Sequence, residues 1–457
     1  MFDEKSKYGY NLIMAEIKNK KIIVAMSPHK SLRDSAGQAT AKAGQAGGDE
    51  RRRVIVAMSP HKSLRDSAGQ AGGNKKSRIV IAMSGGVDSS VAAKILKDHG
   101  HELAGIFLHF WKDEIPPAPF SKGGLAENKC CSLEALMDAR RVCQKVGLPL
   151  YTLNFSRVFK KEVVNYFLNE YKLGNTPNPC IRCNKLVKLG LLIEQAKKLG
   201  FDYVASGHYA CIKKTRKHPP AKAWHWRAGE NTKTKFIYKL FRAKDEDKDQ
   251  SYFLYTLTQE QLKHLLFPLG NYTKDEVRKI AEKFNLPVAA KKESQEICFI
   301  PGKSHNDFLR KYLKLKPGPI KILDGKKVGE HQGLPLYTIG QRKGVEIGGI
   351  GPFYVVKCDY KNNTLYVVKD ALDPALYGDK LIAKNVNWVA GREPKMPFTC
   401  EAVIRYRHKP VKSKVKSHKV KSQYLVKFVE PQRAITPGQS IVFYRKDEVL
   451  GGGIISF

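Results

Sequence analysis

Two cysteines, Cys180 and Cys183, stand three residues apart in the segment NPCIRCNK at residues 178–185, just before an expected helix. The helix dipole and the neighbouring cations Arg182 and Lys185 would stabilise a thiolate there. A structural zinc site would need a second Cys or His pair at comparable spacing, and none follows. The pair therefore indicates reactive sulfur, with inert buried thiols as the alternative.

A third cysteine, Cys298, lies far away in the sequence, in the segment SQEICFI at residues 294–300. Apolar residues flank it, and the basic Lys291 and Lys292 precede it. A single cysteine in such surroundings is more often an unreactive core residue. Together with the earlier pair, it becomes a candidate partner in sulfur transfer.

A glycine-rich segment, SGGVDSS at residues 84–90, follows an apolar strand and precedes a helix. Its two glycines let the backbone approach a phosphate, and the start of the helix offers amides to an anion. The segment lacks the lysine of the G-x-x-x-x-G-K-S/T loop, which argues against γ-phosphate transfer and favours a loop that grips departing pyrophosphate. The structural alternative is a tight strand-to-helix turn capped by Asp88.

These candidate residues lie within a regular alternation of strands and helices. We expect strands at residues 79–83, 103–109, 149–154 and 203–206. Helices are expected at residues 89–99, 133–146, 158–171 and 184–199. Gly100 and Gly147 are stop signals for the first two helices. This alternation implies right-handed crossovers and a parallel sheet covered on both faces.

The pattern changes after about residue 315 to short strands and turns, such as residues 323–326 and 359–363, and no strong helix follows. The expected fold class is α/β: a parallel-sheet nucleotide-binding domain, a small β-rich central domain and a C-terminal β-barrel. We place these domains at residues 77–303, 304–377 and 378–457.

Residues 1–76 differ from the rest, because residues 23–38 (IVAMSPHKSLRDSAGQ) recur without change at residues 55–70. A third copy begins at residue 78 and diverges into the glycine-rich segment. Two complete copies of so short a repeat do not make a solenoid. We expect a partly duplicated, poorly ordered extension that binds no ATP, because both copies lack the GGVDS continuation.

Three further segments look like insertions into surface loops, which cost little stability. They are residues 116–128, rich in Pro and Gly, the basic residues 213–235, and a Lys, Val and Ser run at residues 409–423. We expect the last to be a solvated hairpin tip, with an extended basic binding face as the alternative.

The chain carries 81 Lys plus Arg against 43 Asp plus Glu, a formal net charge of +38. Such an excess favours a nucleic-acid partner over a merely solvated surface. No apolar run reaches the roughly 18 residues of a membrane span, and no signal peptide is recognisable. The nine cysteines, an odd number, do not resemble a secreted disulfide framework. We expect a cytoplasmic protein with no membrane partner.

The SGGVDSS segment after a strand resembles the PP-loop ATP pyrophosphatases, which adenylate a carbonyl oxygen and release pyrophosphate. A narrower resemblance covers residues 77–457, apart from the insertions, and is to the bacterial-type tRNA-specific 2-thiouridylases. It rests on motifs that occur in the order of that family: SGGVDSS, GIFLHFW, NPCIRCNK, ASGHYA, KDQSYFLY, SQEICF, TIGQRKG, RYRH and TPGQS.

This resemblance implies an enzyme that uses ATP and Mg²⁺ to thiolate the wobble uridine of tRNA at C2, with Mg²⁺ held by phosphates and Asp88. Cys183 resembles the catalytic nucleophile, and Cys298 resembles the cysteine that receives a persulfide from a sulfur-carrier protein. The implied ATP-binding residues are Ala82, Met83, Ser84, Gly85, Gly86, Val87, Asp88, Ser89, Leu108 and Gly207. The residues implied to contact the target base or tRNA are Asn178, Pro179, Cys180, His208, Lys248, Asp249, Gln250, Arg405, Tyr406 and Gln439.

Three alternatives stay open at this point. Cys180, Cys183 and Cys298 are also a possible ligand set for an iron–sulfur cluster whose open iron site would carry the sulfur. Another PP-loop enzyme, such as an amidotransferase or a lysidine synthase, would not need Cys183 and Cys298. A non-catalytic RNA-binding protein would have kept an unused nucleotide loop.

Overall fold

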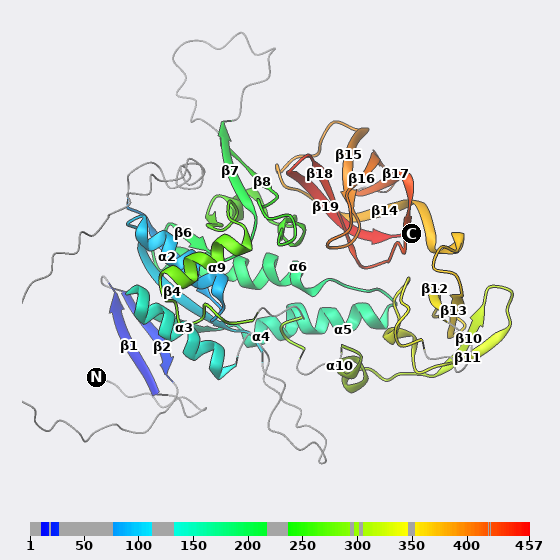
Figure 1. Cartoon of the computed structure of the whole chain (residues 1–457), viewed down its shortest axis with the longest axis horizontal. Helices are drawn as coiled ribbons and strands as arrows, with labels where there is room; N and C mark the ends of the chain where they lie inside the picture. The colour runs from blue at the N-terminus through cyan, green and yellow to red at the C-terminus, as the bar shows by residue number, and fades with distance from the viewer. Residues whose placement is uncertain are drawn as a thin grey trace, which may run out of the picture. The chain divides into compact units, whose positions relative to one another are not determined.

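The computed structural model describes residues 11–17, 20–26, 76–111, 132–216, 236–292, 297–300, 305–345, 352–418, 420 and 422–457 (Figure 1). The chain divides into two compact units, Met1–Arg65 and Asp66–Phe457. In the described part of the chain, no helix is long and apolar enough to cross a membrane.

The first unit contains one antiparallel hairpin of strands β1 (Asn11–Ile17) and β2 (Lys20–Met26). The first repeat copy begins within β2, and the second copy lies outside the described residues. The expectation of a poorly ordered extension over residues 1–76 therefore falls mainly outside them as well. The insertion expected at residues 116–128 also lies outside the described residues.

A five-stranded parallel sheet in the order β5-β4-β3-β6-β9 forms the centre of the second unit. Strand β3 has five buried residues of six, which is typical of a strand covered on both faces. This confirms the expected parallel α/β sheet. The strands are β3 (Arg78–Met83), β4 (Glu102–His109), β5 (Leu150–Asn154), β6 (Tyr203–Ala205) and β9 (Leu265–Leu266).

Helices follow the strands, and local signals set their ends. Ser132 caps α3 by accepting from the Ala135 amide, and Gly147 ends the helix at φ 71°. Thr273 and Glu276 form a capping box at the start of α9. The helices up to residue 262 are α2 (Val87–Asp98), α3 (Leu133–Val146), α4 (Ser156–Phe159), α5 (Asn165–Lys172), α6 (Pro179–Cys183), α7 (Leu192–Lys198) and α8 (Gln259–Leu262). Two more follow, α9 (Lys274–Lys283) and α10 (His305–Tyr312).

Two expected helices contain π-helical turns, η2 (Lys160–Val164) between α4 and α5, and η3 (Asn184–Leu191) between α6 and α7. The second helix also begins earlier than expected, at Pro179 instead of residue 184. Asn178 accepts from the Cys180 amide and Pro179 occupies the first turn, which together start the helix there. The two thiols therefore lie in the first turns of the helix, not before it.

Beyond α10, a four-stranded sheet has the order β11-β10-β13-β12, and a six-stranded barrel is closed by the pairing of β14 with β19. The sheet strands are β10 (Gly318–Ile322), β11 (Lys327–His331), β12 (Tyr354–Asp359) and β13 (Thr364–Val368). The barrel strands are β14 (Tyr377–Trp388), β15 (Phe398–Val403), β16 (Val411–Ser417), β17 (Gln423–Arg433), β18 (Ser440–Arg445) and β19 (Glu448–Ser456). Three 3-10 turns are η4 (Ser251–Phe253), η5 (Leu334–Leu336) and η6 (Pro374–Leu376). The expected central β-rich part and C-terminal barrel are thus confirmed.

The expectation of surface loops at residues 213–235 and 409–423 is wrong in part. Residues 213–216 belong to β7 (Cys211–Arg216), which pairs with β8 (Phe236–Phe241). The middle of the Lys, Val and Ser run is barrel strand β16, in which Ser413 and Val415 are buried while the alternating Lys412, Lys414 and Lys416 are exposed. A period of two, hidden by the repetitive composition, makes this segment a half-buried strand.

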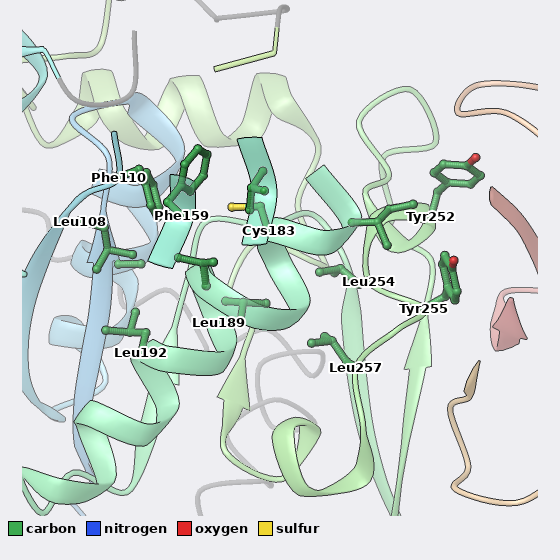
Figure 2. Packing of buried hydrophobic residues seen from close by; sticks show 14 of the residues in the cluster. Leu108, Phe110, Phe159, Cys183, Leu189, Leu192, Tyr252, Leu254, Tyr255 and Leu257 are labelled. Atoms are coloured by element: carbon green, nitrogen blue, oxygen red, sulfur yellow. The ribbon is translucent and has the colours of Figure 1, made fainter. Parts of the chain in front are cut away.

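The largest hydrophobic cluster extends from the parallel sheet to the barrel, and Figure 2 shows part of it around Cys183. Its aromatic part centres on Phe299, next to Cys298 in sequence. The Phe299 ring lies 5.5–6.3 Å from the rings of Trp111, Phe159, Phe167 and Phe308. These contacts fix the short segment that carries Cys298.

We expect Phe299→Ala to lower the free energy of unfolding by about 3–5 kcal/mol, because it leaves a cavity among four aromatic rings. The matched control is Leu372→Ala, whose side chain is 72% exposed, with a change below about 0.5 kcal/mol. Urea unfolding followed by circular dichroism measures both. Equal effects of the two substitutions would contradict this assignment of the core.

Candidate functional site

One cavity of about 630 Å³ collects most of the residues singled out in the sequence. It is lined by Ala82, Met83, Ser84, Gly85, Gly86, Val87, Asp88, Ser89, Leu108, Pro179, Cys180, Cys183, Gly207, His208, Lys248, Gln250, Cys298 and Tyr406. The glycine-rich loop and the three cysteines, far apart in sequence, therefore face the same space.

The glycine-rich loop joins β3 to α2 and is held by its own serines. Ser89 Oγ accepts from the Ser84 amide at 3.3 Å and donates to the Gly86 carbonyl at 3.2 Å. Gly85 has a φ of +70°, and a Cβ there would lie 2.2 Å from the Ala135 carbonyl oxygen, so only glycine fits. No side chain caps the start of α2 at Gly86, which leaves that end of the helix suited to an anion.

Gly207 brings the end of β6 against the start of α2. A Cβ on Gly207 would lie 2.7 Å from the Ser89 nitrogen and 2.8 Å from the Asp88 carbonyl carbon. Any larger residue would push apart the two segments that frame the loop. The position predicted for nucleotide binding therefore has a clear steric requirement.

Asp88, in the first turn of α2, shares one carboxylate oxygen between two donors. The Lys274 ammonium donates to Oδ1 at 2.7 Å, and the Tyr209 hydroxyl donates to the same oxygen at 2.8 Å. The Asp88 side chain is 34% exposed, whereas that of Lys274 is 8% exposed. The second oxygen, Oδ2, is the atom suited to a hard cation such as Mg²⁺, together with phosphate oxygens.

Of the two thiols of α6, Cys183 is buried and Cys180 is half-buried, and both are uncharged at neutral pH. Burial, with a smaller contribution from the nearby Cys298, raises the pKa of Cys180 to about 12, although Lys188 opposes the shift. Burial raises the pKa of Cys183 as well, with Cys298 again adding to the shift. Lys188 favours the Cys183 thiolate in two ways, through its charge and through its backbone amide. Lys188 is thus the cation that counteracts the burial of both thiols.

Lys188 also approaches His208, which is 6% exposed. The Lys188 ammonium lies 3.4 Å from His208 Nε2, and His208 Nδ1 lies 2.7 Å from the Ser206 hydroxyl. An ammonium can only donate, so Nε2 accepts and Nδ1 carries the proton. Burial, with the Lys188 charge, lowers the pKa of His208 well below its ordinary value, so the ring is neutral.

The iron–sulfur ligand set of Cys180, Cys183 and Cys298 stays a prediction. In the described part of the chain, which includes all three, no group of three or more His, Cys, Asp or Glu side chains is arranged to hold a metal ion.

Four predicted residues hold the local structure and do not line the cavity. Asn178 caps α6. Buried Asp249 accepts from the Ser251 hydroxyl at 2.7 Å and from the Ala243 amide at 3.0 Å. Arg405 donates to Thr436 at 3.2 Å, and the Gln439 side chain donates to the Thr176 carbonyl at 2.8 Å. Their roles toward tRNA stay predictions.

The sequence analysis missed two cations of the cavity, Lys188 and Lys274. Lys188 follows Cys183 by five residues, which an α-helical wheel places about 140° apart. The π-helical turn η3 contains Lys188 and directly follows Cys183, and no local sequence signal indicated it. Lys274 begins an ordinary capped helix 186 residues from Asp88, and no local signal distinguishes it.

We expect Lys188→Met to raise the pKa of the Cys183 thiol further, because the cation that favours the thiolate is lost. Alkylation of Cys183 by iodoacetamide at about pH 9 should slow roughly 3- to 10-fold, the size of a shift of half to one pKa unit. Mass spectrometry of the tryptic peptide that begins at Cys183 measures the rate. Lys188→Arg is the control and should react as wild type; an unchanged rate in Lys188→Met would exclude the effect.

Three family models match successive parts of the chain. Residues 77–302 match the model of the tRNA methyl transferase HUP domain, residues 306–369 that of the tRNA methyl transferase PRC-barrel domain, and residues 378–455 that of the aminomethyltransferase beta-barrel domain. The tRNA-specific 2-thiouridylase MnmA of Roseiflexus castenholzii is 46% identical over 83% of this chain and 99% of its own length. MnmA 1 of Caldanaerobacter subterraneus subsp. tengcongensis is 45% identical over 83% of this chain and 98% of its own.

Among solved structures, NMN synthetase from Francisella tularensis is 14% identical and covers 54% of this chain and 76% of its own, with a TM-score of 0.28. That likeness is too low to support any conclusion about this chain. The sequence relatives, in contrast, extend over nearly their whole length at well above 40% identity. The chain therefore belongs to the tRNA-specific 2-thiouridylase family.

Proposed function

We propose that this chain catalyses the ATP-dependent 2-thiolation of the wobble uridine of tRNA. The observation that carries this proposal is the shared cavity of the glycine-rich loop, Cys183 and Cys298. Adenylation and sulfur transfer act on the same uracil carbon, so both sets of groups must reach one small volume. An anion loop without nearby thiols, or thiols without the loop, would not support this reaction.

In the first step, O2 of the uracil attacks the α-phosphorus of ATP and pyrophosphate leaves. A uracil carbonyl is a poor electrophile, and adenylation converts its oxygen into a leaving group. The amides at the start of α2 and the ammonium of Lys274 are suited to the phosphate charge. Asp88 Oδ2 is suited to Mg²⁺, which would offset charge as pyrophosphate departs.

In the second step, the terminal sulfur of a Cys298 persulfide reaches C2 and AMP leaves. Either this sulfur attacks C2 directly and Cys183 then breaks the remaining S–S bond, or Cys183 first releases it as sulfide. Both routes end with 2-thiouridine, AMP and a Cys183–Cys298 disulfide. A thiol reductant must supply two electrons to restore the cysteines, and a sulfur-carrier protein must supply the next persulfide.

The target base must leave its stack to reach the thiols. Two aromatic side chains of the cavity, Phe253 and Tyr406, lie 4.5 Å apart between ring centroids, and the Arg407 guanidinium lies 5.3 Å from the Tyr406 ring. Such a group is suited to stacking an unpaired base. It supports an RNA substrate whose base is splayed out of an anticodon loop.

A lysine row on the outer face of the barrel supports a polyanionic partner. Lys380 on β14 lies opposite Lys427 on β17, which lies opposite Lys414 on β16, and all three are exposed. Like charges directly opposite each other on neighbouring strands destabilise a sheet. RNA phosphates would relieve this repulsion, so we assign the lysine row to tRNA binding.

Two other functions differ in their requirement for the thiols. Another PP-loop enzyme would keep its activity without Cys183 and Cys298, and a non-catalytic RNA-binding protein would not consume ATP. Cys183 and Cys298 lie in the same cavity as the nucleotide loop, which favours thiolation over both of these functions.

Incubation with ATP, Mg²⁺, a persulfide donor and unmodified tRNA should yield 2-thiouridine, detected by mass spectrometry of the digested tRNA. Cys183→Ser and Cys298→Ser should reduce the product at least about 100-fold, because each removes a sulfur that takes part in bond exchange. Free sulfide should restore part of the activity of Cys298→Ser. The control Cys400→Ser changes a barrel thiol outside the cavity and should act as wild type.

Wild type could yield no product with the persulfide donor but yield product after anaerobic iron–sulfur reconstitution. That result would show that a cluster carries the sulfur, and not a Cys298 persulfide. Full activity of Cys183→Ser would instead favour another PP-loop reaction.

The triple variant Lys380→Gln, Lys414→Gln and Lys427→Gln should bind tRNA about 5- to 30-fold more weakly at low salt. The slope of log K against log salt should fall by roughly 2, because fewer phosphates are neutralised. The matched control replaces the exposed helix residues Lys145, Lys197 and Lys283 with Gln, which removes the same charge. Equal losses in both triple variants would show that only net charge matters.

A further inference from the structure

The ammonium of Lys274 is held against the first turn of the nucleotide loop's helix. Lys274 is the first residue of α9, where its backbone amide donates to Asp245 at 2.7 Å and the Thr273 capping box fixes the helix start. Its side chain is 8% exposed and lines the cavity. The backbone of Lys274 is therefore held in place, and its side chain lines the space next to the loop.

The partner of this ammonium is Asp88, which also accepts from Tyr209. A buried ion pair pays a desolvation cost, so pairing alone gives little net stability. The same place combines helix amides without a side-chain cap and the glycine-rich loop, both suited to phosphate. A phosphate arriving there would repel the Asp88 carboxylate and attract the ammonium next to it.

The other cations near the cavity have different surroundings. Lys291 pairs with Asp138 and lies 3.5 Å from Glu134, so two carboxylates offset its charge. Lys188 lies beside His208 and the thiols of α6. Lys274, in contrast, contacts the nucleotide loop's helix directly through Asp88.

We propose that Lys274 binds a phosphate group of ATP, and that its ammonium turns from Asp88 to the phosphate when the nucleotide binds. This inference rests on the proposed function, because it assigns ATP to the glycine-rich loop. Lys274 thereby takes the position of the lysine that the loop itself lacks, from a helix 186 residues further along the chain. The exchange also leaves Asp88 available to a divalent cation.

Calorimetric titration of the full chain with ATP, pyrophosphate and adenosine tests this contact without requiring turnover. Lys274→Met should weaken the binding of ATP and pyrophosphate about 10- to 100-fold, the range of one charge-assisted hydrogen bond. Adenosine, which has no phosphate, should bind as to wild type. Lys274→Arg keeps the charge and should recover most of the affinity.

A double variant distinguishes direct binding of phosphate by Lys274 from an indirect effect of Lys274 through Asp88. If Lys274 acts only through Asp88, adding Lys274→Met to Asp88→Asn should leave the affinity for pyrophosphate unchanged. Direct phosphate binding predicts that Lys274→Met still weakens the affinity for pyrophosphate about 10- to 100-fold in the Asp88→Asn background. Thermal unfolding verifies that each variant is folded.

Equal affinity of Asp88→Asn and of the double variant for pyrophosphate, or wild-type affinity in Lys274→Met, would overturn the inference while leaving the proposed function intact. A folded wild-type chain that binds neither ATP nor pyrophosphate would overturn both.

Discussion

The site depends on one constraint, the parallel pairing that brings the carboxyl ends of neighbouring strands to the same edge of a sheet. Strands β3, β4 and β6 end at Met83, His109 and Ala205. The residues that follow, including residues 84–89, Phe110 and Gly207, line the cavity. Ligands of open parallel sheets bind at such an edge, where strand ends, helix starts and loops converge.

Burial of the thiols is the second constraint. It protects them from oxidation and alkylation, but it also lowers their reactivity in sulfur transfer. Raised pKa values keep Cys180 and Cys183 protonated at neutral pH, which slows their oxidation and alkylation. The same burial would slow their chemistry unless a cation compensates. Lys188 supplies that charge from within the same helix, and the aromatic cluster around Phe299 holds the segment of Cys298 near them.

Much of the fold could be predicted from the sequence because apolar strands and capped helices have local signals. The helix Leu133–Val146 was expected with the bounds that the structure gives it, since Ser132 and Gly147 mark its ends. The lysine-rich strand β16 was misassigned because its composition resembles a solvated loop, although Ser413 and Val415 alternate inward. Sequence motifs identified the thiols and the loop. That Lys274 lies in the same cavity depends on long-range packing, which no local pattern encodes.

The most direct test of the shared cavity is a single turnover without reductant. The chain is first loaded with persulfide at Cys298, then mixed with ATP, Mg²⁺ and unmodified tRNA, and digested without reduction for peptide mapping. A Cys183–Cys298 disulfide should form in an amount equal to the 2-thiouridine produced. Product without this disulfide, or a disulfide that links Cys180 in place of Cys183, would contradict the account.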